Sequence, residues 1–409
     1  MKTDFQPVII GSDNTVYGLA RSFHMAYGKK SIVICRHATN AILGSKIISE
    51  ICTEPKLMDE NIFVKKLTEI ADTWYKKNPN TRLLLVTPVS DVYAELVSKN
   101  RLKLENLFDM NVPDWKLYQK LTNKTQFYKL CEKYGLDYPK YTAVDEKSYK
   151  NPIKINFPAV IKPADSASYW QLPRFDGYQK VYFVDNQTEA IKILDLIFGK
   201  GYSGEVIIQE KIPADTAHQQ DITTYSGKKS AKVNFTQLFQ AVLADNNPLS
   251  TGIFCALLPA KNASLENKIA KFLNDIGYTG FAGLNIMIDP RDNKPKLLEL
   301  NARLHGESYA LTAMGNNPAK ILISDIYGGD FKKTDTEIIW KSVPNHIIRK
   351  FMSKNSIKDK VIKLLKQGKT DTELNYKVDL SPKRRKNYYY FMLGNCRNFK
   401  KFARQSEIN

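Results

Sequence analysis

Short apolar segments alternate with helical patterns near the start of the chain, and this alternation most constrains the fold. Three runs have the length of buried strands: Pro7–Ile10, Ser31–Cys35 and Arg82–Thr87. Between them, apolar residues recur at helical spacing in Val16–Tyr27 and Asn61–Lys77. Strands that alternate with helices are typical of a parallel sheet. The sequence therefore predicts an N-terminal α/β domain at residues 1–112.

Two further α/β regions are expected after this domain. In residues 113–212, Asn123-Lys124 opens a helix, and three strands are predicted at Phe157–Lys162, Val181–Val184 and Val206–Gln209. In residues 213–335, a strand is predicted at Gly252–Leu258, and a hairpin joins Phe281–Ile288 to Lys296–Leu300. Residues 336–409 show a less readable pattern and are treated as a basic C-terminal extension.

Composition restricts the class of protein. Hydrophobic residues make up 43% of the chain and charged residues 25%, which is ordinary for a globular protein. We find no apolar run of about 18 residues, so no transmembrane helix is expected. The five cysteines are scattered and form no CxxC pair, which argues against a disulfide framework or a structural zinc site. These features favour a cytoplasmic protein.

The formal net charge of +19 is unevenly distributed. Residues 341–409 contain 18 Lys and Arg but only 5 Asp and Glu. This charge is either a solvated surface or a site for an anionic partner, such as a nucleotide-linked substrate or an acidic membrane surface. No nucleic-acid partner is expected, because we recognise no reading module. The aromatic cluster at Tyr388–Phe391 either packs onto the preceding domain or lies on a membrane surface.

Four polar signals along the chain carry chemistry. Lys124 lies at the mouth of a helix, Lys162 ends a strand, and Gln209-Glu210-Lys211-Ile212 follows another strand. Lysines at such positions are fixed positive charges suited to a polyphosphate. The fourth signal is KLLELNAR, in which Glu299 and Asn301 are two residues apart on a strand and face the same side.

Oxygen atoms from this pair are the ligands that Mg²⁺ prefers, together with substrate phosphates. Arg303 follows closely and is suited to neutralise a transferring phosphoryl group or a carboxylate.

The order and spacing of these signals resemble the ATP-grasp superfamily. LTNKTQFYKLCEKYGLDYPKY is similar to the segment that opens its central lobe, and FPAVIKPADS to its nucleotide-binding lysine strand. VIIQEKIP is similar to its adenine hinge, and GFAGLNIMIDPRDNKPKLLELNAR to its metal-binding hairpin. Within the superfamily, the chain most resembles the D-aspartate ligases of peptidoglycan synthesis. The resemblance implies an N-terminal parallel-sheet domain and two lobes that sandwich ATP.

The same resemblance implies a reaction and a set of roles. Such ligases join the β-carboxylate of D-aspartate, through an acyl phosphate, to the lysine side-chain amine of a UDP-linked muramyl (UDP-MurNAc) pentapeptide. Lys124 and Lys162 would hold the phosphates of ATP. Gln209 and Ile212 would present backbone to adenine, with Glu210 nearby. Glu299 and Asn301 would hold Mg²⁺ or Mn²⁺ with help from Asn285, while Arg303 and Lys162 would be catalytic.

Two departures from the family pattern stand out. Asn285 occupies a position where the family usually has a metal-binding acid, so the metal would be held with one less charge. No glycine-rich phosphate loop follows Asp165, and backbone amides of Ser166–Ser168 are expected to serve instead. One alternative is therefore a ligase for another amino acid or dipeptide. Another is a non-catalytic nucleotide-binding scaffold with a basic anion-binding end.

Two smaller motifs have open interpretations. Gly11-Ser12-Asp13 lies between a strand and a helix, so it is either an anion site or a plain turn. His305 follows Arg303 and is interpreted as a structural residue rather than a base. The sequence leaves open the catalytic base, the acceptor and the oligomeric state.

Overall fold

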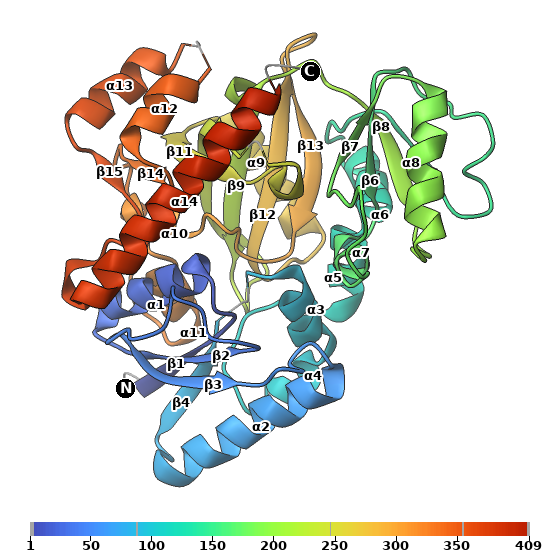
Figure 1. The fold of residues 1–409 in the computed structure, drawn as a ribbon. Helices are drawn as coiled ribbons and strands as arrows, with labels where there is room; N and C mark the ends of the chain where they lie inside the picture. Colours follow the sequence, from blue (N-terminus) through green and yellow to red (C-terminus); the bar gives the residue numbers. More distant parts are fainter. Residues whose placement is uncertain (1–3, 87–88, 246, 354–355, 407–409) are drawn as a thin grey trace.

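The computed structural model describes residues 4–86, 89–245, 247–353 and 356–406, which build three sheets (Figure 1). The N-terminal sheet has the strand order β3-β2-β1-β4, and all its pairs are parallel. Its elements are β1 (Asp4–Ile10), α1 (Asn14–Tyr27), β2 (Ser31–Cys35), β3 (Ile48–Thr53), α2 (Glu60–Lys77), β4 (Thr81–Leu85), α3 (Asp91–Lys99) and α4 (Arg101–Leu104). The predicted parallel α/β unit is confirmed.

The side chains of β1 point alternately to the two faces of the sheet, and both faces are buried. Val8 and Ile10 pack with α2 residues such as Phe63, whereas Ile9 packs with α1 residues such as Phe23. Successive side chains of a strand point to opposite faces, so a strand rich in Val and Ile contributes to the hydrophobic cores on both sides of the sheet. The helices therefore cover both sides of the sheet.

A small antiparallel sheet with the order β5-β8-β6-β7 forms a separate lobe, seen at the right of Figure 1. Its elements, with the two helices that precede it, are α5 (Trp115–Thr122), α6 (Lys124–Lys133), β5 (Tyr141–Val144), β6 (Ala159–Pro163), α7 (Ser166–Trp170), β7 (Tyr182–Val184), α8 (Gln187–Gly199) and β8 (Val206–Glu210). Asn123 caps α6 by accepting a hydrogen bond from the Gln126 amide, as the sequence predicts.

The largest sheet has seven strands in the order β13-β12-β9-β10-β11-β14-β15. Only its β14–β15 pair is parallel. The strands and helices of this part are β9 (Gln219–Ser226), β10 (Val233–Ala244), β11 (Phe254–Ala260), α9 (Ala263–Asp275), β12 (Gly280–Asp289), β13 (Lys294–Asn301), α10 (Tyr309–Ala313), α11 (Pro318–Ile326), β14 (Ile339–Lys341), α12 (Asn345–Phe351), α13 (Lys358–Lys366), β15 (Thr370–Asp371) and α14 (Pro382–Ser406). The predicted hairpin is β12–β13.

The C-terminal extension is folded onto the rest of the chain. Strands β14 and β15 extend the large sheet, and α14 runs diagonally across the molecule in Figure 1. Near the start of α14, Arg384 forms a 3.2 Å ion pair with buried Asp379, which also accepts a hydrogen bond from Tyr17 of α1. The division at residues 112, 212 and 335 stays a prediction: the sheets follow its first two boundaries, whereas β14 and β15 continue the sheet beyond the third.

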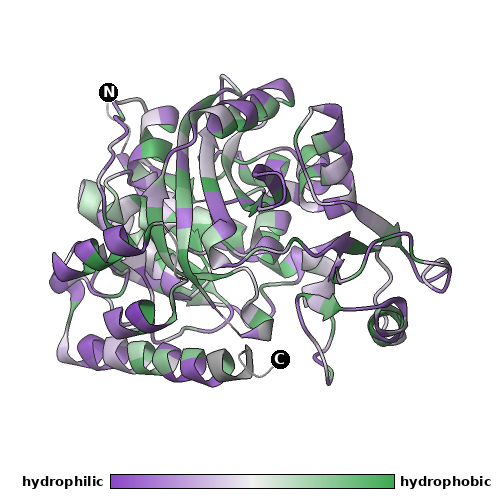
Figure 2. Cartoon of the chain, turned by 90° about the horizontal axis from the view of Figure 1, so that it is seen from above, coloured by the Kyte–Doolittle hydropathy of each residue, from purple (hydrophilic) through white to green (hydrophobic). Residues whose placement is uncertain are grey.

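Seen from above, the central strands show hydrophobic, intermediate and hydrophilic residues, and α14 also carries both hydrophilic and hydrophobic residues (Figure 2). Within the aromatic cluster, Tyr388 and Phe391 pack against a hydrophobic core, while Tyr389 and Tyr390 are exposed. Packing therefore accounts for half of that cluster. In the described part of the chain, no helix combines the length and the apolar character needed to cross a membrane.

Candidate active site

Two adjoining cavities lie between the small sheet and the large one. The smaller has a volume of about 220 Å³ and the larger about 730 Å³. They share a wall that includes Lys124, Lys180, Asn285 and Glu299. A chemical group that passes from one cavity to the other would therefore pass these polar side chains.

The smaller cavity is mainly apolar and has the character of an adenine site. It lies between the small sheet and the β12–β13 hairpin, and its apolar lining includes Val160, Phe183, Ile212, Met287 and Leu298. Polar groups converge at one end, where both predicted phosphate lysines are found. An apolar slot with a few placed charges is the usual form of a nucleotide pocket.

A β-bulge in the hairpin turns a backbone carbonyl toward this cavity. The register shifts between Asn285–Glu299 and Ile286–Leu297, which leaves Leu298 without an opposite partner. The Leu298 carbonyl accepts hydrogen bonds from the Tyr128 hydroxyl at 2.8 Å and from Lys162 Nζ at 3.5 Å. The bulge thus helps to position the lysine at the end of β6.

Positive charge is concentrated where the two cavities meet. Lys124 Nζ lies 3.2 Å from a Glu299 carboxylate oxygen, and Lys180 Nζ lies 3.9 Å from the other. Burial, reinforced by Lys124, lowers the pKa of Lys162 to about 7. Burial opposes ionisation of Glu299, but Lys124 and the other lysines hold its pKa well below the ordinary value. Two buried lysines, Lys124 and Lys162, and the partly exposed Lys180 surround one carboxylate, which suits a polyanionic ligand such as a polyphosphate.

Three neighbouring strands place polar side chains in one row. Asn285 of β12 is paired with Glu299 of β13 on one side and with Asp221 of β9 on the other. Residues directly opposite each other on adjacent strands share a face of the sheet. The row therefore consists of an amide between two carboxylates.

The next row holds Asn301 beside Gly283, with the ring of His305 above the glycine. A Cβ atom on Gly283 would lie 2.1 Å from His305 Nε2, so the absent side chain makes room for the ring. Asn301 Nδ2 lies 3.0 Å from His305 Nε2 and donates a 3.3 Å hydrogen bond to Asn285 Oδ1. The side-chain oxygen of Asn301, Oδ1, therefore faces Arg303, whose Nη2 donates to it at 3.2 Å.

These side chains fit a magnesium ion. The donor set is one ionised carboxylate, Glu299, with the amide oxygens of Asn301 and Asn285 beside it. Mg²⁺ is typically held by one or two carboxylates, substrate phosphates and water rather than by a full protein cage. Among the described residues, no three His, Cys, Asp or Glu side chains form a group that could hold a metal ion.

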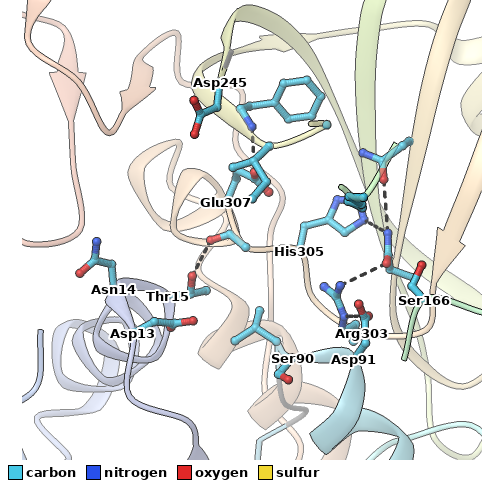
Figure 3. Close-up of a pocket in the computed structure, with 18 of the residues that line it drawn as sticks. Asp13, Asn14, Thr15, Ser90, Asp91, Ser166, Asp245, Arg303, His305 and Glu307 are labelled. Atoms are coloured by element: carbon cyan, nitrogen blue, oxygen red, sulfur yellow. Dashed lines mark hydrogen bonds and ion pairs between the residues drawn. The ribbon is translucent and has the colours of Figure 1, made fainter. Parts of the chain in front are cut away.

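The larger cavity has a mixed lining of polar and apolar side chains and is built from both halves of the chain (Figure 3). Arg303 lines this cavity and donates a 2.5 Å hydrogen bond to Asp91, at the start of α3. Across the opening in Figure 3, Asp13, Asn14 and Thr15 lie at the start of α1. Asp13 caps that helix by accepting from the Val16 amide at 3.0 Å. The Gly11-Ser12-Asp13 turn thus places a carboxylate, not an anion site, at the helix start.

The structure gathers most of the predicted site residues in one place. Six of them line the smaller cavity: Lys124, Lys162, Gln209, Ile212, Asn285 and Glu299. Asn301 and Arg303 line the larger cavity. Glu210 is the exception, because its carboxylate pairs with Arg291 at 3.0 Å and accepts from the Lys140 amide. Its side chain lines neither cavity.

The segment after Asp165 also differs from expectation. The amides of Ala167 and Ser168 are capped by the Asp165 side chain, so two of the amides predicted to bind phosphate are already engaged. Instead, the Ser166 hydroxyl accepts a 2.8 Å hydrogen bond from Lys124. Sequence reasoning also missed Lys180 and Asp91, which lie far from the recognised motifs and carry no local signal.

Comparison with known proteins agrees with this geometry. No protein-family model matches the chain. The D-aspartate ligase of Enterococcus faecium (strain Aus0004) is 30% identical over 420 residues, which cover 99% of this chain and 98% of that protein. This chain is a member of the D-aspartate ligase family. It is an ATP-dependent ligase that forms carbon–nitrogen bonds.

Solved structures show that the ligase has the ATP-grasp fold. The biotin carboxylase domain of Hydrogenobacter thermophilus 2-oxoglutarate carboxylase, in complex with MgADP, superposes with a TM-score of 0.61 at 12% identity, covering 81% of this chain and 72% of that one. An ADP complex of N5-carboxyaminoimidazole ribonucleotide synthetase gives a TM-score of 0.60 at 15% identity, with 83% and 81% covered. L-amino acid ligase from Bacillus licheniformis gives 0.56 at 13% identity, with 80% and 75% covered.

Proposed function

We propose that this ligase uses ATP to join the β-carboxylate of D-aspartate to the lysine side-chain amine of a UDP-linked muramyl pentapeptide. The observation that carries the proposal is the junction of the two cavities at Lys124 and Glu299. A nucleotide-sized slot there opens directly into a space for two further substrates. The nearly full-length similarity to a D-aspartate ligase supports the choice of amino acid.

In the first half-reaction, the chain's lysines hold the phosphates of ATP. Lys124, Lys162 and Lys180 place three amino groups where negative charge accumulates as the γ-phosphoryl group is transferred, and that charge favours the protonated form of Lys162. The carboxylate of the amino acid attacks that phosphorus in line, which gives an acyl phosphate and ADP. Bound Mg²⁺, held by Glu299 and Asn301 with Asn285 beside them, would neutralise phosphate charge during this transfer.

In the second half-reaction, the neutral amine attacks the acyl carbon and phosphate leaves. Arg303 lines the larger cavity, where it can orient a carboxylate, although it must share its charge with Asp91. A lysine-type amine has an ordinary pKa of about 10.4 and must first lose its proton. Carboxylates that line the cavity, including Asp13 and Glu307, would hold the ammonium form before that loss. We place this reaction in the cytoplasm.

The test measures phosphate release from ATP and Mg²⁺ across a panel of D- and L-amino acids. Each is assayed with and without a UDP-muramyl pentapeptide whose stem carries a free lysine amine. Release that requires D-aspartate and the pentapeptide, with a product heavier by one aspartyl residue, is the expected result. Release with another pair of substrates would support ligase activity but contradict the proposed substrates. Folded protein that binds ATP without any release would instead favour a non-catalytic scaffold.

A further inference from the structure

The C-terminal helix forms part of the wall of the larger cavity. Phe391, Asn395, Asn398 and Phe399 of α14 line it, next to Trp340 of β14. The cavity therefore extends from the phosphate-binding lysines to the extension that begins near residue 336. None of these α14 residues belongs to the motifs that the sequence analysis connected with chemistry.

Side-chain contacts hold α14 firmly in this position. Asn395 Nδ2 donates to the Ser342 carbonyl at 2.8 Å, and Phe399 packs with Phe351 at a ring distance of 5.1 Å. At the other end of the helix, Arg384 donates to the carbonyls of Leu43 and Ala41, both at 3.1 Å. The wall is thus a fixed part of the cavity and not a loosely attached basic tail.

The size of the cavity indicates what it accepts. Its volume of about 730 Å³ is more than three times that of the nucleotide slot. Sites for drug-sized ligands span roughly 300–1,000 Å³, so an aspartate alone would leave most of this space unfilled. The cavity therefore has room for a second substrate much larger than an amino acid.

The lining indicates the chemistry of that substrate. Among the described residues that line the cavity, the lysines and arginines are Lys124, Lys180 and Arg303, all at the nucleotide end. The remote end presents the carboxylates of Asp13 and Asp245, carboxamides and aromatic rings. Such a surface suits the peptide part of an acceptor, with its amine, amide and hydroxyl groups.

We propose that α14 forms the acceptor-binding wall, so that the extension selects a bulky, peptide-like amine acceptor; this rests on the proposed ligase function. Asn398 and Phe391 contact the acceptor on the inner face of the helix. The outer face, with exposed Tyr389 and Leu393, does not take part.

The experiment separates the two half-reactions. Hydroxylamine, a small nucleophile, traps the acyl phosphate as a hydroxamate and does not need the acceptor site. Asn398→Trp and Phe391→Ala are compared with Tyr389→Ala and Leu393→Ala, which change the outer face of the same helix. The inner-face variants should raise the KM for the UDP-muramyl pentapeptide by roughly tenfold or more. Hydroxamate formation should stay within about twofold of wild type, and the outer-face controls should match wild type in both assays.

An unchanged acceptor KM in Asn398→Trp, or an equal loss of hydroxamate formation, would overturn the inference. Failure of the proposed function would look different, because wild-type protein would then form no hydroxamate with any amino acid. In that case calorimetric titration with the pentapeptide decides. Binding to wild type that Asn398→Trp weakens would support the α14 site, and absence of binding to wild type would reject it.

Discussion

His305 Nδ1 lies 2.6 Å from a carboxylate oxygen of Asp221, and both side chains are buried. The other ring nitrogen lies 3.0 Å from the amide nitrogen of Asn301. Burial opposes protonation of His305, but Asp221 raises its pKa above the ordinary value; in its neutral form the ring donates from Nδ1 to Asp221 and accepts from Asn301 at Nε2. The Asn301 side-chain oxygen is thereby turned away from the ring and toward Arg303, whose Nη2 donates to it at 3.2 Å. Asp221 thus sets, through His305, the orientation of Asn301, the residue proposed to bind the metal.

Asp221→Asn should weaken the metal site without removing any ligand. Partners behind metal ligands typically contribute about 10–100-fold in metal affinity or activity. We expect a loss in that range for Mn²⁺ affinity, measured by titration in the presence of ADP, and a matching fall in kcat. Asp325→Asn is the control. Asp325 accepts a 2.8 Å hydrogen bond from the hydroxyl of Tyr225, which lies on β9 like Asp221. Asp325 itself lines neither cavity. Equal Mn²⁺ affinity in the two variants would contradict the role of Asp221.

Gly283→Ala should displace His305, because the new Cβ would lie 2.1 Å from its ring. Overpacking of this kind costs about 1–3 kcal/mol in the free energy of unfolding. Mn²⁺ affinity should fall with it, since the ring no longer orients Asn301. Adding His305→Ala should restore the stability, measured by urea unfolding, but not the Mn²⁺ affinity. A double variant that recovers both would show that the ring has no part in the metal site.

Asn285→Asp should strengthen metal binding and lower the free energy of unfolding of the metal-free protein. The new carboxylate would lie between Asp221 and Glu299 on adjacent strands, where like charges repel. A metal ion relieves that repulsion and gains a charged ligand. We expect Mn²⁺ to bind roughly tenfold more tightly. Urea unfolding with and without Mn²⁺ should show lower stability only in the metal-free variant, and unchanged affinity would count against Asn285 as a ligand.

Glu373→Gln should stabilise the protein at alkaline pH. Burial raises the pKa of Glu373 from 4.5 to about 7, while the Trp340 indole donates to its carboxyl group at 3.0 Å. A raised carboxyl pKa favours folding fully below pH 4.5, and this contribution is lost as pH rises through 7.

The gain in the free energy of unfolding should therefore be at most about 3 kcal/mol at pH 8 and close to zero near pH 4.5. Urea unfolding at the two pH values measures it. A gain that does not depend on pH would show that Glu373 is ionised in both the folded and the unfolded chain.

Local patterns were sufficient to predict the framework of the fold. The alternation before residue 110 gave the parallel sheet, and the Asp289–Asn293 turn gave the β12–β13 hairpin. Strand β9 was missed because its sequence, QQDITTYS, is polar. Its burial comes from pairing with β10 and β12 on both sides, which no local pattern records.

The same limit applies to the site. Ligands on one strand, such as Glu299 and Asn301, are visible in the sequence because their spacing fixes a common face. Asp221 reaches them across two strands, and its role depends on the register of β9 against β12. Phe399 reaches the larger cavity from the other end of the chain. Predicting such residues requires the tertiary pairing itself.

The two cavities also differ in when they can form during synthesis. The residues that line the nucleotide slot lie between Lys124 and Glu299, so this slot needs no segment beyond the hairpin. The larger cavity joins Asp13 to Phe399 and must wait until α14 has left the ribosome. A nascent chain could therefore form the cavity proposed for the nucleotide before the cavity proposed for the acceptor, whose wall includes α14.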